Sequence, residues 1–279
     1  MKRWSATLLV FAVCSAVVHA DITIVQKTTV EGGPTAAMAS AGGVPSPTMT
    51  SRIKGTKGRV DVDMGSTTIT TNMSTITDAT TKQVILLDHN QKTARVSTGA
   101  PPAAGTPPPP SVKVDAAVVP TGKSQTIDGM KCDEYSFTTT MNMSDVGGAQ
   151  MPPEAAAAMQ GVVMTMKGSL WVAKEAPGAA EYRAYQKSMA SAELLGAAMG
   201  ATGMSMPGME KLAKAMATVD GVPVLTEMSM GVEGGTGQMA EMMKQMMGDM
   251  KVTTKVLSLK TDAIGDDVFQ VPQGYQVIK

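Results

Sequence analysis

Residues 135–144 read YSFTTTMNMS and alternate almost without exception between two kinds of side chain. The odd positions hold Tyr135, Phe137, Thr139, Met141 and Met143, and the even positions hold only Ser, Thr and Asn. Successive side chains of a β-strand point to opposite faces, so a period of two predicts a strand with one face on the core and one in solvent. This stretch therefore predicts an antiparallel sheet.

The same period of two recurs along much of the chain. It predicts further strands over residues 22–30, 59–64, 67–77, 162–173 and 222–233. The apolar runs 84–87 and 93–96 flank a polar turn at 88–91, which predicts a hairpin. In 250–262 the apolar residues change parity after Val256, and a β-bulge would account for that slip.

Helical periodicity appears in three places. Apolar residues recur at spacings of three and four in 179–199 and 209–219, which predicts two amphipathic helices. A third, methionine-rich helix is predicted over 238–250. Together these segments indicate an α+β protein with an antiparallel sheet.

Methionine is the most informative residue type in the composition. The sequence has 26 Met but only 3 Phe, 2 Trp and 4 Tyr, so thioethers stand where aromatic rings would be usual. Met side chains are flexible and polarizable and adapt to apolar partners of differing shape. Many lie two apart on predicted strands or on one stripe of the third helix, and the candidate ligand-binding set is Met141, Met143, Met164, Met166, Met228, Met230, Met239, Met242, Met243 and Met246.

Three interpretations of these methionines compete. They could line a concavity that binds or carries an acyl chain, a lipid or a lipidated partner, and this is the function we expect. Thioethers also select Cu(I) in exported proteins, although the His and Cys co-ligands usual in such sites are scarce. In the third interpretation they are ordinary core residues of a structural envelope protein.

The first twenty residues have the features of a secretory signal. Lys2 and Arg3 precede an apolar run at 8–13, and small residues at 18 and 20 predict cleavage after Ala20. Val13 before Cys14 departs from a lipoprotein signal, so we expect a protein that is periplasmic or secreted without a lipid anchor. No later run approaches the length needed to span a bilayer.

The remaining chain offers little for other classes of function. The full sequence has 24 basic and 24 acidic residues, so removal of Lys2 and Arg3 with the signal leaves a slight excess of acidic residues. No basic stripe indicates a nucleic-acid partner. One histidine, His89, and one cysteine, Cys132, remain, which disfavours zinc cages and Cys–His catalysis. We expect Cys132 to be a buried apolar residue and the acidic pairs at 61/63 and 266/267 to be solvated. No catalytic activity, metal or cofactor is therefore expected.

Domain organisation is predicted to be simple. Residues 21–279 are expected to form a single domain, since single domains of this class reach such lengths. Three low-complexity insertions interrupt it near 99–111, 147–161 and 234–248, the first of them proline-rich. The third contains the methionine-rich helix, which we expect to close over the sheet as a mobile lid.

Three stretches resemble exported bacterial proteins of unknown function: TGKSQTIDGMKCDEY at 121–135, LWV at 170–172 and DVFQVPQGY at 267–275. In strand order, these proteins are similar to the periplasmic lipoprotein-carrier superfamily, the LolA-like fold. The resemblance implies a strongly curved antiparallel half-barrel with helices covering or filling its concave face. It implies acyl-chain binding as an expectation only, because fold does not determine function.

Overall fold

We describe a computed structural model of the chain for residues 21–32, 46–64, 72–98, 114–143, 159–191, 194, 197, 209–235, 238–247 and 250–278. The predicted signal peptide and the first insertion lie outside these residues, as does most of the second insertion.

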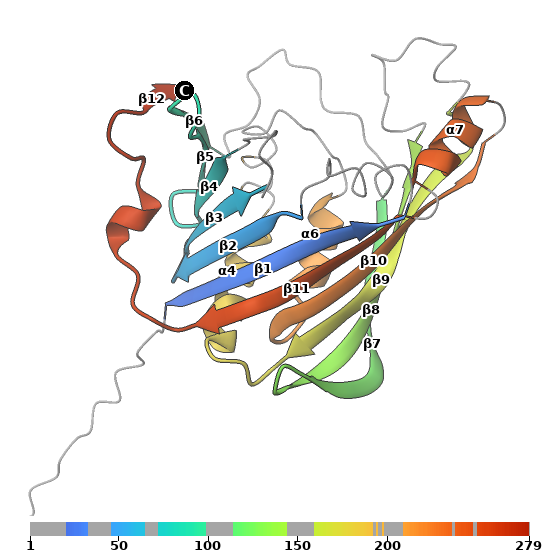
Figure 1. Ribbon diagram of the computed structural model, residues 1–279, viewed down its shortest axis with the longest axis horizontal. Coiled ribbons are helices and arrows are strands. Elements are labelled where there is room, and N and C mark those ends of the chain that lie inside the picture. The colour runs from blue at the N-terminus through green and yellow to red at the C-terminus, as the bar shows by residue number, and fades with distance from the viewer. Residues whose placement is uncertain are drawn as a thin grey trace, which may run out of the picture.

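The described residues form one large sheet (Figure 1). Its strands are β1 (Ile22–Glu31), β2 (Thr48–Lys54), β3 (Lys57–Asp63), β4 (Met73–Asp78), β5 (Gln83–Asp88), β6 (Thr93–Thr98), β7 (Val114–Ile127), β8 (Met130–Asn142), β9 (Val162–Ala173), β10 (Val222–Gly234), β11 (Lys251–Lys260) and β12 (Gln276–Ile278). The helices are α4 (Ala179–Met189), α6 (Met209–Met216), α7 (Gln238–Met247) and the 3-10 turn η2 (Asp266–Phe269).

The sheet is open and almost entirely antiparallel. Its strand order is β12-β6-β5-β4-β3-β2-β1-β11-β10-β9-β8-β7, so β1 and β11 join the N-terminal and C-terminal halves in the middle. Only the pairing of β12 with β6 is parallel. The edge strands β7 and β12 do not pair with each other, so the sheet does not close into a barrel.

The predicted fold class, an α+β half-barrel with helices covering or filling the concave face, is wrong. The described part of the chain is mostly β, and its α-helices are only 11, 8 and 10 residues long. Helix α4 contacts β2 and β10, α6 contacts β7 and α7 contacts β10, so each covers only a small part of the sheet. Alternation runs through far more of the sequence than helical periodicity does, and this accounts for the composition of the fold.

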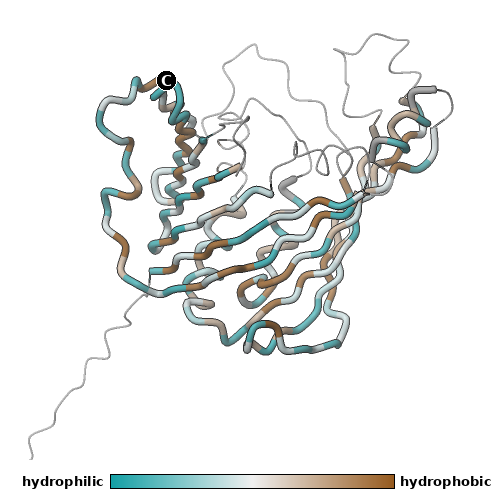
Figure 2. The backbone as a smooth tube through the Cα atoms, viewed as in Figure 1, coloured by the Kyte–Doolittle hydropathy of each residue, from teal (hydrophilic) through white to brown (hydrophobic). Residues whose placement is uncertain are grey.

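The two faces of the sheet differ in character, as the alternating colours along the strands show (Figure 2). We call the side against which α4 and α6 pack the helix face, and the opposite side the outer face. In β10, Met228 packs with Met216 of α6 and with Val219, and therefore points to the helix face. Its neighbours Glu227 and Ser229 point to the outer face.

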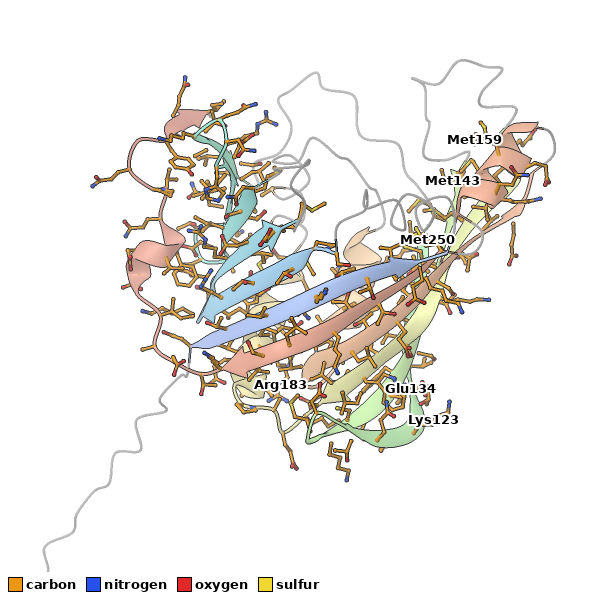
Figure 3. The ribbon with its side chains drawn as sticks, viewed as in Figure 1. Lys123, Glu134, Met143, Met159, Arg183 and Met250 are labelled. Atoms are coloured by element: carbon orange, nitrogen blue, oxygen red, sulfur yellow. The ribbon has the colours of Figure 1, made fainter. Side chains whose placement is uncertain are left out.

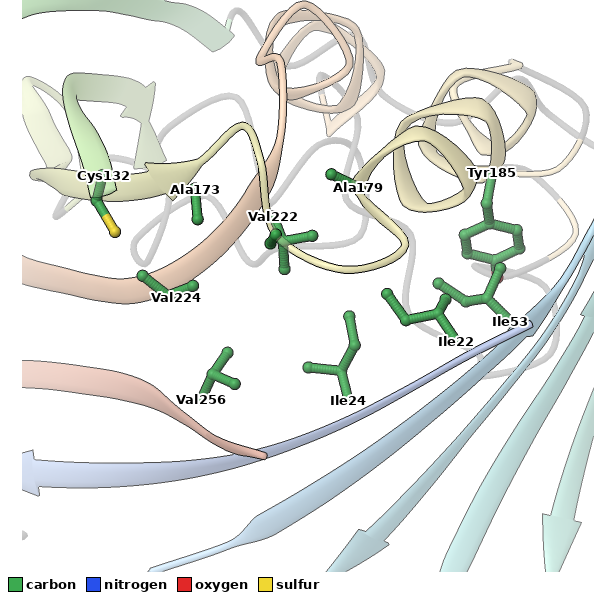
Figure 4. Packing of buried hydrophobic residues seen from close by; sticks show 11 residues of the cluster. Ile22, Ile24, Ile53, Cys132, Ala173, Ala179, Tyr185, Val222, Val224 and Val256 are labelled. Atoms are coloured by element: carbon green, nitrogen blue, oxygen red, sulfur yellow. The ribbon is translucent and has the colours of Figure 1, made fainter. Parts of the chain in front are cut away.

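The main core lies between the middle strands and α4 (Figure 4). Ile22, Ile24 and Ile53 from β1 and β2 meet the Tyr185 ring of α4, whose hydroxyl oxygen lies 2.6 Å from Thr77 Oγ1. Cys132 lies in the same core and is fully buried, as predicted. Desolvation, with smaller contributions from nearby acidic charges, raises the pKa of the Cys132 thiol, and we expect this buried cysteine to resist thiol reagents in the native protein.

A second core covers the outer face of β3 to β6. Residues 264–278, here called the C-terminal strap, run along that face from the end of β11 to β12 (Figure 1). Ile264 and Phe269 of the strap are buried against apolar side chains of the sheet, namely Ile76, Ile85, Leu87 and Ala94. Strands β4 and β5 are therefore covered on both faces, since Tyr185 contacts Thr77 and Leu194 packs on Val84 on the helix face.

Candidate functional site

Methionines from three neighbouring strands lie next to one another on the helix face. In the strand register Met164 of β9 stands opposite Met141 of β8, and Met166 of β9 stands opposite Met230 of β10. Met228 stands opposite Gly168, two residues along from Met166. We call Met141, Met164, Met166, Met228 and Met230 the methionine face. Directly opposed side chains have Cβ atoms about 4.5–5.5 Å apart, so neighbouring thioethers can touch.

The methionine face is only partly covered. Met141 is buried with Val114 and packs against Met164, but Met164, Met166, Met228 and Met230 are all half-buried. Met228 also packs against the cluster that contains Phe137 and Val219. The face therefore combines apolar side chains with accessible surface, and its side chains can change rotamer at low cost.

The remaining candidate methionines lie near the N-terminal end of β9 and the C-terminal end of β10. Met143 follows β8 and, with Met243 of α7, packs against Val162, Val232 and Ala240 (Figure 3 labels Met143). Met242 is 51% exposed, so α7 buries Ala240 rather than a continuous methionine stripe. The side chains of Met239 and Met246 lie outside the described residues. Helix α7 itself packs on β10.

Sequence reasoning did not include Met250 or Thr139 among the candidate ligand-binding residues. The Met230 N–H donates to the Met250 carbonyl at 3.1 Å, which places half-buried Met250 beside Met230. Thr139 stands opposite Met166 and is almost fully buried. Parity along the predicted strand could have located Thr139, since it shares the odd positions with Met141. Met250 was assigned to the predicted helix instead.

A cavity lies on the opposite side of the same strands. It has a volume of about 710 Å³ and is lined mainly by outer-face residues, among them Thr165, Lys167, Ser229, Glu233 and Lys251. A smaller hollow of about 320 Å³ adjoins it around Lys167 and Glu227. Both contain charged side chains of both signs. The groove therefore opens on the outer face and is rich in charged side chains, although Met230 also lines the first hollow and Met228 the second.

A polar network under the C-terminal strap is the other notable cluster. Arg59 Nε donates to Asp61 Oδ1 at 2.7 Å, and Arg59 Nη1 donates to the Val268 carbonyl of the strap at 3.1 Å. Asp61 also accepts from Ser74, which is 2% exposed. The acidic residue at position 61, expected to be solvated, is thus half-buried and fixed by hydrogen bonds. Asp266, in contrast, pairs with Lys54 at 2.9 Å while remaining largely exposed.

His89 connects this network to the strap. Its Nε2 lies 2.5 Å from Ser74 Oγ and its Nδ1 lies 2.5 Å from Tyr275 Oη. Because ionised Asp61 can only accept, the Ser74 hydroxyl donates a hydrogen bond to Asp61 and accepts one from His89 Nε2–H. His89 Nδ1 then accepts from Tyr275, a tautomer assigned from the network. A histidine that donates to the serine does not activate it as a nucleophile, so the network holds the strap in place.

Asp61 should make the stability of the protein depend on pH. Burial alone would raise the pKa of Asp61, but hydrogen bonds from Ser74 and Arg59 and the charges of Arg59 and Arg52 outweigh it and lower that pKa. The stabilisation is therefore complete above the unfolded-state pKa of about 4 and is lost as the pH falls below it. We expect the loss of unfolding free energy between pH 5 and pH 3 to be smaller in Asp61→Asn, by urea denaturation. Equal losses in both proteins would contradict this role.

Part of the chain is similar to a known protein family. Residues 36–150 match the family model described as a domain of unknown function, DUF4412. The matched stretch contains strands β2 to β8 and residues on either side of them. No curated protein matches the sequence. The match indicates similarity to an uncharacterised family, and no link to the lipoprotein carriers is shown.

His, Cys, Asp and Glu side chains in the described ranges form no group of three that could hold a metal ion. None of the helices described is both long enough and apolar enough to cross a membrane.

Proposed function

We propose that this chain is an exported, non-catalytic protein that binds or carries an apolar ligand on the methionine face. Suitable ligands are an acyl chain, a lipid or a lipidated partner, met in the periplasm or outside the cell after cleavage behind Ala20. The observation that supports this most is the strand register, which sets methionines of β8, β9 and β10 side by side on one face while four of the five stay half-buried.

The physical argument is that a half-buried apolar surface gains free energy when a ligand covers it. Each Å² of apolar area removed from water contributes about 25 cal/mol. Met side chains can re-pack around chains of different shape, so such a face tolerates varied apolar ligands. The outer-face groove is lined largely by polar and charged side chains, so it is less suited to an apolar ligand.

Cu(I) binding is a second candidate, favoured by the same register. Met166 faces Met230 directly, and Met164 lies on the same face two residues from Met166, so several thioether sulfurs are within reach of one another. Thioethers are soft ligands that favour Cu(I). A structural protein whose methionines only fill the core remains the third interpretation.

Leucine substitutions separate the first two candidates. We expect a variant with Leu at 164, 166, 228 and 230 to keep the wild-type affinity for a hydrophobic fluorescent dye within a few-fold. Leu and Met have similar volumes and usually exchange for less than about 1.5 kcal/mol. The variant should show no Cu(I) binding at this face, because Leu has no donor atom. Lost dye binding with a folded protein would argue against an apolar site.

A matched pair of glutamine variants tests which face binds. Met166→Gln with Met230→Gln places polar groups on the methionine face, and we expect it to weaken dye binding at least tenfold. Thr165→Gln with Ser229→Gln makes equivalent changes on the outer face of the same strands and should leave binding unchanged. If wild-type protein fails to bind the dye at all, the methionines are ordinary core residues.

A further inference from the structure

The methionine face contains one polar atom that the described structure leaves without a partner. Thr139 Oγ1 is buried and makes no hydrogen bond to any described residue, and it is the one side-chain atom among these residues in that condition. The side chain is 1% exposed. Buried hydroxyls normally have a partner, and an unsatisfied one costs free energy of folding. Its presence in the candidate site therefore calls for an explanation.

The surroundings of Thr139 are apolar in every direction along the sheet. On the neighbouring strands it stands opposite Met166 of β9 and Ala116 of β7. On its own strand the residues that share its face are Phe137 and Met141, both buried. The hydroxyl thus points to the helix face in the middle of the apolar surface. Half-buried Met166 is the adjacent side chain with the freedom to move aside.

We propose that Thr139 is the polar anchor of the ligand site and that the ligand is an amphiphile with an uncharged hydrogen-bonding group, an ester or a hydroxyl. This inference rests on the proposed function and specifies its ligand class. The aliphatic chain of the ligand lies on Met164, Met166 and Met230, and its polar group forms a hydrogen bond with Thr139 Oγ1.

The polar group must be uncharged because of what surrounds it. None of the four register and strand neighbours of Thr139 carries a charge, so a carboxylate there would be buried without a counter-ion. Burying an unpaired charge costs far more than one hydrogen bond to a hydroxyl returns. A neutral ester carbonyl or alcohol meets the need of Thr139 without that cost.

Four probes of equal heavy-atom count test the proposal by displacement of a bound hydrophobic dye: dodecane, 1-undecanol, methyl nonanoate and decanoate. With wild-type protein we expect the alcohol and the ester to bind about three- to tenfold more tightly than dodecane, as one net hydrogen bond allows. Decanoate at neutral pH should bind more weakly than the ester. In Thr139→Val the advantage of alcohol and ester over dodecane should disappear while dodecane affinity stays the same.

Thr138→Val, on the outer face of the same strand, is the matched control and should keep the wild-type order of affinities. Thr139→Val should also be at least as stable as wild type to urea, because it removes an unsatisfied hydroxyl without changing the shape of the side chain. The proposal is overturned if dodecane binds as tightly as the ester in wild type, or if Thr139→Val keeps the preference. If dodecane still binds in either of these two cases, the proposed function is unaffected. If none of the four probes binds, both the proposed function and the role of Thr139 are overturned.

Discussion

Replacing Gly168 with alanine is expected to destabilise the protein by about 3 kcal/mol, the upper end of the range for added groups in a packed interior. Gly168 lies in β9 on the helix face, opposite Met228 and beside the methionine face. A methyl group there would overlap the backbone carbonyl oxygen of Glu227 in the neighbouring strand. Backbone cannot rotate away as a side chain can, so the β9–β10 pairing itself must shift.

Gly231→Ala is the control for this prediction. Gly231 lies in β10, and a methyl group there would meet nothing closer than the Thr165 carbonyl oxygen at 4.0 Å. Urea denaturation should show a change of less than about 0.5 kcal/mol for this variant. Gly168→Ala should also lose dye binding, because the methionines of β9 and β10 would no longer be in register. Wild-type stability for Gly168→Ala would show that the strands are not packed as described.

Replacing Phe269 with alanine is expected to cost about 3–5 kcal/mol, as for other buried Phe→Ala changes. Phe269 belongs to η2 in the C-terminal strap and is buried in the cluster on the outer face of β4 to β6. Its loss would leave a cavity against Ile76 and Ile85 that the sheet cannot close. Because total stabilities are typically about 5–15 kcal/mol, the variant should be close to unfolding.

The matched control is Val277→Ala, in the same segment but 50% exposed, which should change stability by less than about 0.5 kcal/mol. Hydrogen exchange adds a local readout. In Phe269→Ala the amides of β4 to β6 should exchange faster than those of β8 to β10, since only the former lie under the strap. A cost below 1 kcal/mol would mean that the strap is peripheral to the fold.

The sequence predicted individual strands better than it predicted the fold class. Alternation in 162–173 coincides with β9, and the slip in 250–262 is the bulge at Leu257, where pairing with β1 passes from Val256 to Ser258. Strands β2, β7 and β12 were not predicted. Much of β7 is an exposed edge strand that contains Pro120, so it lacks the apolar face on which the pattern depends.

The class was wrong because alternation extends over far more of the chain than helical periodicity does, so most of the described residues form the sheet. Within 179–199 the structure describes α4 (Ala179–Met189) and helical backbone at 194 and 197. The apolar residues of the strap gave no periodic signal, yet they cover the outer face of β4 to β6. Both faces of β5 are therefore buried, since Val84 and Leu87 lie in apolar clusters on opposite faces of this strand. For this reason the run 84–87 is apolar throughout and does not alternate.

The candidate site shows the same limit. Parity within each strand correctly placed Met141, Met164, Met166, Met228 and Met230 on one face, because the side-chain period of two is local. Which strands adjoin, and therefore which methionines meet, depends on a register that no single strand encodes. The network of Asp61, Ser74, His89 and Tyr275 was missed for this reason, since its members come from β3, β4, the turn after β5 and the strap.

Photolabelling with an aliphatic diazirine probe can show directly which face of the sheet binds an apolar ligand. Irradiated with wild-type protein and mapped by peptide mass spectrometry, the probe should insert at Met164, Met166, Met228 and Met230, and excess 1-undecanol should suppress the labelling. Residues that alternate with these on the same strands, such as Thr165 and Ser229, serve as internal controls because they face the other way. Labelling of the outer-face residues instead, or labelling that undecanol does not reduce, would contradict an apolar-ligand site on the methionine face.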